Sequence, residues 1–329
     1  MLQVPLSAAY FQGAASVQPH TGGGLQPWRL PHSSHHLFPS PDDGLLVKAS
    51  HGSGVRLHFT SATTAIELEY DPLTPVDPNN KEMSPHSFDV TIDGEIVANA
   101  LADGSSARLE LPPAAMTEPR TLEVWLPQGS AIVLRSLAID AGTTALIEPD
   151  PRPVWVTYGS SLTHCTRANS PACTWPALVA RKYNLHLISL GFGGDCHLEP
   201  MLGFHIRDLG ADYITLKLGI NTLNTLGPRT FPGLATGLIH IIREACPNTP
   251  LTVVSPMSYP PNETEPSATG NTMEKMRADL EEAVIRRCDH HADTNLRYVD
   301  GLLVFNHDEI AEVREKNARR CDACHHLSR

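Results

Sequence analysis

The residues best suited to chemistry follow an apolar segment that has the length of a β-strand. This segment, Val154 to Tyr158, runs into Gly159-Ser160-Ser161-Leu162, where small residues let the backbone turn and leave a hydroxyl at the start of the next helix. Backbone N–H groups at a helix start stabilise an oxyanion that forms beside them. The pattern therefore indicates Ser161 as a nucleophile, although Ser161 taken alone fits the common role of a helix N-cap.

Two later strand ends carry groups that could complete such a site. The apolar segment His186 to Leu190 leads into the glycine-rich turn Gly191 to Asp195, which can present a backbone N–H to a ligand oxygen. The segment Tyr213 to Leu218 leads into Gly219-Ile220-Asn221, whose side-chain amide is a hydrogen-bond donor. The glycine run lacks the pattern of a P-loop or a dinucleotide site. A serine, a glycine N–H and an asparagine amide at three successive strand ends are the parts of a nucleophile with an oxyanion hole.

This half of the chain resembles the SGNH hydrolases, the GDSL-type esterases and acyltransferases, over residues 154 to 325. The blocks that carry the resemblance are Gly159-Ser160-Ser161-Leu162, Gly194, Asn221 in a G-x-N pattern, and Asp322-Ala323-Cys324-His325 in a D-x-x-H pattern. The resemblance implies that Ser161 is the nucleophile and that Gly194 and Asn221 help to bind the oxyanion. It also implies that His325 is the general base, with Asp322 fixing its tautomer.

Two positions depart from the family's blocks. Ser160 stands where the family usually has Asp, and His326 follows His325 where a proline is usual. His326 is therefore a second candidate base, and a binding protein with a decayed catalytic half is an alternative interpretation. We expect His164, three residues after Ser161, to lie on the flank of the helix and to be a poorer base than His325.

Cysteine and histidine near the end of the chain allow other interpretations. Cys321-Asp322-Ala323-Cys324-His325 matches the C-x-x-C-H pattern of haem attachment, but such attachment accompanies export. Four ligands so closely spaced rarely surround one zinc ion. We therefore expect no cofactor and no metal site.

The N-terminal half has the alternation of apolar and polar residues that is typical of a half-buried sheet. Val55, Leu57 and Phe59 alternate with polar neighbours, and the segment Phe88 to Ile92 runs into the hairpin dipeptide Asp93-Gly94. Helical periodicity is absent between about residues 44 and 140. These patterns predict an antiparallel, jelly-roll-like β-sandwich, preceded by an irregular lead-in of about forty residues.

The segment Glu148 to Pro153 carries three prolines and reads as a linker. Beyond it, apolar strands alternate with helical stretches, of which the clearest are Pro176 to Lys182, Phe231 to Glu244 and Thr272 to Arg287. Such alternation predicts an α/β domain with a parallel sheet in a three-layer α/β/α arrangement, flavodoxin-like in the family that it resembles. We expect the domains to be residues 1–148 and 149–329.

Composition excludes several classes of function. The 25 Lys and Arg against 36 Asp and Glu give a net charge of -11, and no basic run is present, so nucleic acid is not an expected partner. No apolar stretch has the length of a membrane span, and the first residues lack the features of a secretory signal. The 7 cysteines are an odd number confined to the second half. We expect a cytoplasmic protein without a disulfide framework.

These observations lead to one main expectation and two alternatives. We expect a metal-independent serine esterase that hydrolyses an O-acyl ester, with an acetylated sugar or glycoside as a candidate small-molecule substrate. The N-terminal segment Gly52 to Leu68 is similar to the sandwich of two-domain carbohydrate esterases and of some natural-product acyltransferases. An acyltransferase, in which an acceptor hydroxyl replaces water, uses the same residues and is the first alternative. The binding protein is the second.

Overall fold

The computed structural model describes residues 1–41, 43–73, 86–113, 118–306 and 308–309. Contacts between residues group the chain into two compact units. The first unit contains Met1–Cys196 and Phe204–Ile214, and the second contains His197–Gly203 and the chain from Thr215 onward. The division at residues 148 and 149 stays a prediction.

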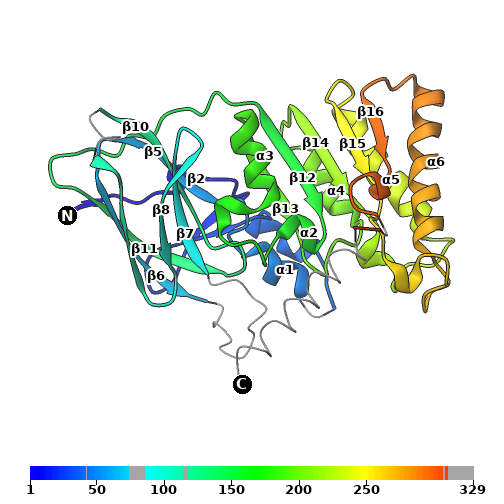
Figure 1. Ribbon diagram of the computed structural model, residues 1–329, viewed down its shortest axis with the longest axis horizontal. Helices are drawn as coiled ribbons and strands as arrows, with labels where there is room; N and C mark the ends of the chain where they lie inside the picture. The colour runs from blue at the N-terminus through cyan, green and yellow to red at the C-terminus, as the bar shows by residue number, and fades with distance from the viewer. Residues whose placement is uncertain (42, 74–85, 114–117, 307, 310–329) are drawn as a thin grey trace. The chain divides into compact units, whose positions relative to one another are not determined.

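The N-terminal region consists of two antiparallel sheets, which confirms the expected all-β architecture (Figure 1). One sheet has the order β3-β4-β11-β6-β9, with β1 also pairing with β11, and the other has the order β2-β5-β10-β7-β8. Apolar residues from both sheets, such as Leu57, Leu68 and Val124, are fully buried in one common core. The strands are β1 (Leu2–Val4), β2 (Phe11–Gln12), β3 (Ser16–Pro19), β4 (Leu25–Trp28), β5 (Arg56–Ser61), β6 (Ala65–Pro72), β7 (Ser87–Ile92), β8 (Glu95–Leu101), β9 (Ser106–Glu110), β10 (Arg120–Trp125) and β11 (Ile132–Ile139).

The Asp93-Gly94 hairpin forms where the sequence predicts it. Ile92 pairs with Glu95 across a two-residue loop, and Asp93 and Gly94 have φ of 51° and 81°. Both values lie in the left-handed region that a tight hairpin of this length requires, which glycine adopts without strain and aspartate tolerates. The dipeptide thus sets the register of β7 against β8.

The first fifty residues are more regular than the sequence predicts. Strands β1 to β4 lie here, with the 3-10 helices η1 (Ala8–Tyr10) and η2 (His32–Leu37). The helix α1 (Gly44–Ala49) follows, where no helix was expected. Strands of two to four residues are too short to show a period of two, and a six-residue helix is too short to show a period of 3.6. Pairing with the longer strands β5 and β11 therefore defines β1, β2 and β4.

The C-terminal half contains the expected five-stranded parallel sheet (Figure 1), in the order β13-β12-β14-β15-β16. Its strands are β12 (Val154–Gly159), β13 (His186–Gly191), β14 (Tyr213–Lys217), β15 (Leu251–Val254) and β16 (Leu296–Val299). Its helices are α2 (Ser161–His164), α3 (Trp175–Tyr183), α4 (Pro200–Arg207), α5 (Phe231–Ala245) and α6 (Met273–His291). The strand order reverses at β12, which is the kind of point where open α/β sheets bind ligands.

In the second unit, α6 begins at a side-chain cap and buries one face. The Thr272 hydroxyl accepts a hydrogen bond from the Lys275 N–H at 3.1 Å, and Met276, Leu280 and Val284 are buried at helical spacing. The helix packs against α5. Among the described residues, no helix has both the length and the apolar character to cross a membrane.

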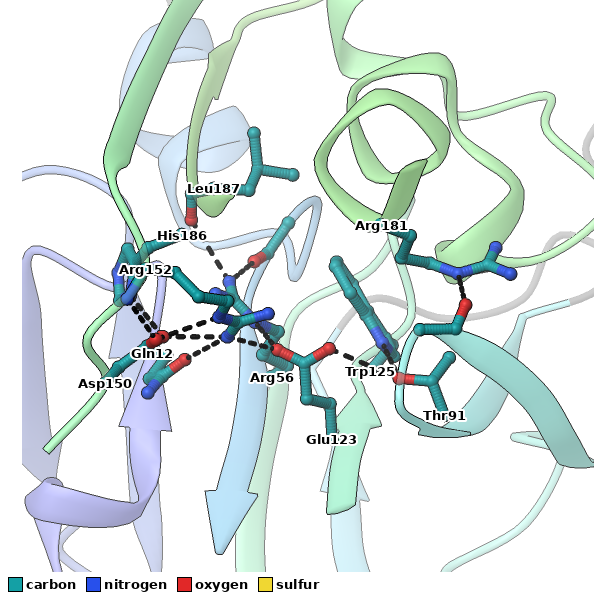
Figure 2. Close-up of polar contacts among 12 residues, drawn as sticks. Gln12, Arg56, Thr91, Glu123, Trp125, Asp150, Arg152, Arg181, His186 and Leu187 are labelled. Atoms are coloured by element: carbon teal, nitrogen blue, oxygen red, sulfur yellow. Dashed lines mark hydrogen bonds and ion pairs between the residues drawn. The ribbon is translucent and has the colours of Figure 1, made fainter. Parts of the chain in front are cut away.

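In the first unit, a buried network of charged side chains joins two sandwich strands to the start of the parallel sheet (Figure 2). Glu123 on β10 accepts hydrogen bonds from Arg56 Nε on β5 at 2.8 Å and from Arg152 Nη2 at 2.7 Å. Asp150 accepts from Arg152 at 2.7 Å and pairs with His186 Nδ1 on β13 at 2.8 Å. Two residues of the predicted linker, Asp150 and Arg152, thus belong to this ionic cluster and are half-buried, whereas the linker residues beside them are exposed.

The network keeps the Glu123 carboxylate ionised. Burial alone would raise the pKa of Glu123, but the charges and hydrogen bonds of Arg56 and Arg152 outweigh it and lower the pKa from 4.5 to about 2. A carboxylate with a lowered pKa contributes stability that is complete above its ordinary pKa and is lost as the pH falls toward the folded value. The contribution of Glu123 should therefore disappear between about pH 4.5 and pH 2.

Glu123→Gln tests this network because it removes the charge and keeps the shape of the side chain. We expect the free energy of unfolding at pH 7 to fall by about 3 kcal/mol, since the buried Arg56 and the half-buried Arg152 lose their shared carboxylate. Equilibrium urea denaturation measures the loss. The control Glu110→Gln removes an exposed partner of Arg108 and should cost less than about 0.5 kcal/mol. Equal losses in the two variants would contradict the importance of the buried network.

Candidate active site

Ser161 lies directly after the carboxyl end of β12, as the sequence predicts. It is the first residue of α2, a single helical turn, and its side chain is exposed. The N-cap position belongs to Ser160, whose side chain is buried and makes no cap hydrogen bond. Ser161 is therefore not the helix cap, which removes the alternative interpretation of this serine.

The glycine turn after β13 lies against Ser161. A Cβ atom placed on Gly193 would be 3.5 Å from the Ser161 Cα and 3.6 Å from its Cβ. The Asp195 N–H donates to the Phe192 carbonyl at 3.1 Å, which closes a four-residue turn, and Gly194 within it has a φ of 88°. That φ favours glycine at this position of the turn. The structure thus brings Ser161 and the turn that contains Gly194 together.

Close packing of α2 on β13 also depends on a glycine. A Cβ on Gly191 would come within 2.3 Å of the His164 backbone nitrogen and 2.4 Å of the Thr163 carbonyl carbon. Backbone atoms cannot give way as a flexible side chain can. Glycine at this position therefore allows the turn that carries Ser161 to rest directly on the end of β13.

The other residues proposed for the site lie either in the second unit or outside the described residues. Asn221 lies in the second unit, in the 3-10 helix η5 (Ile220–Thr222) that follows β14. Gly219 precedes it with a φ of 115°, and a Cβ there would be 2.6 Å from Pro256 Cγ. Asp322 and His325 lie outside the described residues, as does His326.

His164 is buried and engaged on both sides of its ring. The Gly193 N–H donates to His164 Nδ1 at 3.2 Å, and His164 Nε2 is 3.0 Å from the carbonyl oxygen of Gln128. Burial, together with the charge of Arg29, holds the pKa of His164 well below 6.5. With both nitrogens occupied, His164 is poorly placed to accept a proton from Ser161.

A cavity of about 720 Å³ opens beside Ser161. Part of its wall is apolar, with Leu162 exposed and Trp175 half-buried. The Trp175 indole N–H donates to the Leu162 carbonyl at 2.7 Å, and its ring centroid lies 5.8 Å from that of Trp155. These contacts hold the ring in place. The lining residues are Lys48, His51, Ser161, Leu162, His164, Cys165, Thr166, Arg167, Ala168, Cys173, Trp175 and Gly193.

The N-terminal region contributes two polar residues to this cavity that sequence reasoning missed. Lys48 comes from α1, and His51 follows the same helix. His51 is 5% exposed, and neither of its ring nitrogens has a hydrogen-bond partner in the part of the chain that the structure describes. Burial, with the charges of Arg29 and Lys48, lowers its pKa to about 3, so the ring stays neutral at physiological pH. In the sequence, the feature that marks the position of these residues is the short glycine-containing segment His51-Gly52-Ser53-Gly54.

Within the described ranges, no group of three or more His, Cys, Asp and Glu residues is placed to hold a metal ion. The chemistry that this arrangement supports is nucleophilic. Ser161 is exposed, lies beside the glycine turn after β13 and lines a cavity with room for a small acyl ester.

Comparison with known proteins covers both halves of the chain. Residues 152–319 match the model of the GDSL-like lipase/acylhydrolase family, and residues 9–135 match the SsfX3 N-terminal domain. The family match ends before Asp322 and His325. No curated protein gives a match.

Solved structures include one relative of substantial sequence identity. The salicylyl-acyltransferase SsfX3 from a tetracycline biosynthetic pathway is 32% identical, with a TM-score of 0.81, over 92% of this chain and 86% of that one. A protein described as a GDSL-like lipase from Bacteroides ovatus is 18% identical, with a TM-score of 0.70, over 93% of this chain and 89% of that one. A family two carbohydrate esterase from Clostridium thermocellum is 14% identical, with a TM-score of 0.54, over 76% of this chain and 82% of that one. The last two show the fold alone.

The family match spans just over half of the chain, and the relative at 32% identity covers nearly all of it. The chain belongs to the GDSL-like lipase/acylhydrolase family of serine hydrolases.

Proposed function

We propose that the protein cleaves an O-acyl ester through an acyl-enzyme on Ser161. The Ser161 Oγ attacks the ester carbonyl and its proton passes to His325, whose tautomer Asp322 fixes. The N–H groups of Ser161 and Gly194 and the Asn221 amide bind the oxyanion. The protonated His325 then gives its proton to the leaving alcohol, and water attacks the acyl-enzyme by the same route in reverse.

One observation carries this proposal. Ser161 is exposed on a turn whose backbone touches the Gly193 position, and both residues line the same cavity of about 720 Å³. A nucleophile, backbone donors and space for a substrate therefore meet at one strand edge. The roles of Asn221, Asp322 and His325 rest on the family's blocks.

The proposed substrate is a small-molecule or carbohydrate acyl ester. Structural neighbours named as carbohydrate esterases share the two-part architecture, which supports an ester on a sugar or glycoside. The alternative is an acyltransferase that delivers the acyl group to an acceptor hydroxyl. The relative named as a salicylyl-acyltransferase favours this alternative, because it is 32% identical over 92% of the chain.

We also propose a cytoplasmic location and no nucleic-acid or membrane partner. The net charge of -11 supports the exclusion of nucleic acid. The described cysteines, Cys165, Cys173, Cys196, Cys246 and Cys288, form no disulfide with one another, which fits a reducing compartment. The proposed domain division at residues 148 and 149 is supported by the two family matches, which lie on either side of it.

Replacing the proposed nucleophile and base tests the mechanism. We expect Ser161→Ala and His325→Ala each to lower kcat on short-chain p-nitrophenyl esters by about 10³-fold or more. The two residues act as one catalytic unit, so the loss of either costs about as much as the loss of both. The controls Ser105→Ala and His290→Ala remove the same groups at exposed positions and should keep kcat within about twofold. A wild type that turns over no ester would favour the binding protein instead.

Trp175 should set the size of the acyl group that the cavity accepts. We expect Trp175→Ala to lower kcat/KM on acetyl and benzoyl esters by about 10-fold or more, since lost contact in an apolar pocket costs 1–3 kcal/mol. For esters with longer acyl chains, kcat/KM should fall less in this variant. The control Trp175→Phe keeps a ring and should stay within about threefold. An unchanged chain-length profile in Trp175→Ala would show that the acyl group binds elsewhere.

Product analysis separates hydrolysis from acyl transfer. The protein, an aryl or acetyl ester, and either a glycoside or a polyphenol acceptor are incubated together, and the products are separated by mass. A hydrolase yields the free acid at a rate that the acceptor does not change. A transferase yields acylated acceptor in preference to acid, although water is at about 55 M, because its cleft excludes water.

A further inference from the structure

The turn that contains Gly194 is held at every peptide group that leads into it. The Phe192 N–H donates to the Gly159 carbonyl at 2.8 Å, which ties the turn to the end of β12. The Phe192 carbonyl accepts from Asp195, and the Gly193 N–H donates to His164. The next N–H in the chain is that of Gly194, the proposed oxyanion donor. The direction of the Gly194 N–H therefore depends on the hydrogen bonds that fix Phe192 and Gly193.

The ring of His164 has one tautomer that fits its surroundings. The Gln128 carbonyl 3.0 Å from Nε2 can only accept, so the ring proton is on Nε2. Nδ1 is then a lone-pair acceptor, as the Gly193 N–H at 3.2 Å requires. The Ser53 hydroxyl holds the His164 carbonyl at 2.9 Å. His164 is 0% exposed, so its ring is rigidly placed between the sandwich loop at Gln128 and the turn.

Arg29 holds the same turn from the other side. Its buried guanidinium donates to the carbonyls of Ser189 at 3.1 Å and Gly191 at 2.7 Å, the last residues of β13. It also donates to the carbonyls of His51, at 2.9 Å, and Lys48. The guanidinium carbon lies 4.9 Å from the centre of the Phe192 ring. Burial lowers the pKa of Arg29 to about 9, which leaves the side chain charged at neutral pH.

The partners of Arg29 are unusual for a buried arginine. Among the described residues it forms no ion pair, and all of its side-chain hydrogen bonds go to backbone carbonyls. Arg56, which is equally buried, is neutralised by Glu123. A guanidinium whose hydrogen bonds go to carbonyls fixes the backbone, and two of the carbonyls that Arg29 binds, those of Ser189 and Gly191, lead into the turn that contains Gly194.

We propose that Arg29 and His164 are positioning residues that aim the Gly194 N–H at the oxyanion. The proposal rests on the proposed function of Ser161 and Gly194. His164 fixes the turn through the Gly193 N–H, and Arg29 fixes it through the Ser189 and Gly191 carbonyls. Because Arg29 lies in the N-terminal region, that region takes part in catalysis without supplying a reacting group.

Two replacements of His164 separate its two hydrogen bonds. In His164→Asn the Oδ1 stands near the former Nδ1 and can still accept from Gly193. In His164→Gln the Nε2 stands near the former ring Nε2 and keeps only the bond to Gln128. We expect His164→Gln to lower kcat on p-nitrophenyl acetate by about 100-fold, with KM changed less than threefold. The reason is that a displacement of the Gly194 N–H by about 1 Å lowers the reaction rate by about that factor. His164→Asn should stay within about fivefold of wild type.

Arg29→Lys has a matched control in Arg56→Lys. Both remove a guanidinium that is 0% exposed and bonded to a carbonyl of β13, but Arg56 contacts Leu187, near the start of the strand. Thermal unfolding should show a loss of stability in both variants. We expect kcat of the folded protein to fall by about 30-fold or more in Arg29→Lys alone.

Hydrogen exchange at the Gly193 amide tests the proposal independently of activity. Mass spectrometry of peptides that span residues 190–196 should show at least tenfold faster exchange in His164→Gln and Arg29→Lys than in His164→Asn and Arg56→Lys. Faster exchange with lost kcat supports the proposal. Equal exchange in all four variants overturns it, whether or not the wild type is active. Inactive wild type with the expected exchange pattern would overturn the proposed function alone.

Discussion

The hydrogen bonds from the buried Arg29 guanidinium to the last carbonyls of β13 are the interaction on which the site depends. Ser189 and Gly191 are fully buried, so their carbonyls need partners within the protein. Arg29 supplies them and at the same time binds carbonyls at Lys48 and His51. One side chain thereby joins the segment around α1, which lines the cavity, to the strand that leads into the turn containing Gly194. The loss of this side chain would leave several buried acceptors unpaired at once.

The strand β13 is held near both of its ends by arginines from the N-terminal region. Arg56 binds the Leu187 carbonyl and Arg29 binds those of Ser189 and Gly191. Arg56 belongs to an ionic network with Glu123, whereas the side-chain hydrogen bonds of Arg29 within the described part of the chain all go to backbone carbonyls. The close approach of α2 at Gly191 then places Ser161 on this fixed strand. The sandwich strands and β13 therefore belong to one compact unit, and the geometry at Ser161 follows from their joint packing.

The regular parts of this structure could be predicted from local pattern. Alternation at Val55, Leu57 and Phe59 marks a strand, and the small residues around Ser161 mark a turn at a strand end. The lead-in strands could not be found this way, because two to four residues show no period. The role of Arg29 could not be predicted for another reason. Its partners are distant in the sequence, 160 residues away for the bond to Ser189, and a single sequence carries no record of such pairs.

The proposed mechanism requires a reactive hydroxyl at Ser161. The most direct measurement is labelling of the intact protein with a fluorophosphonate, followed by peptide mass mapping. We expect one adduct per chain, located at Ser161, which forms within minutes and is absent after heat denaturation. Labelling at a different residue, or a protein that takes up no label in its folded state, would contradict a nucleophilic serine at this site.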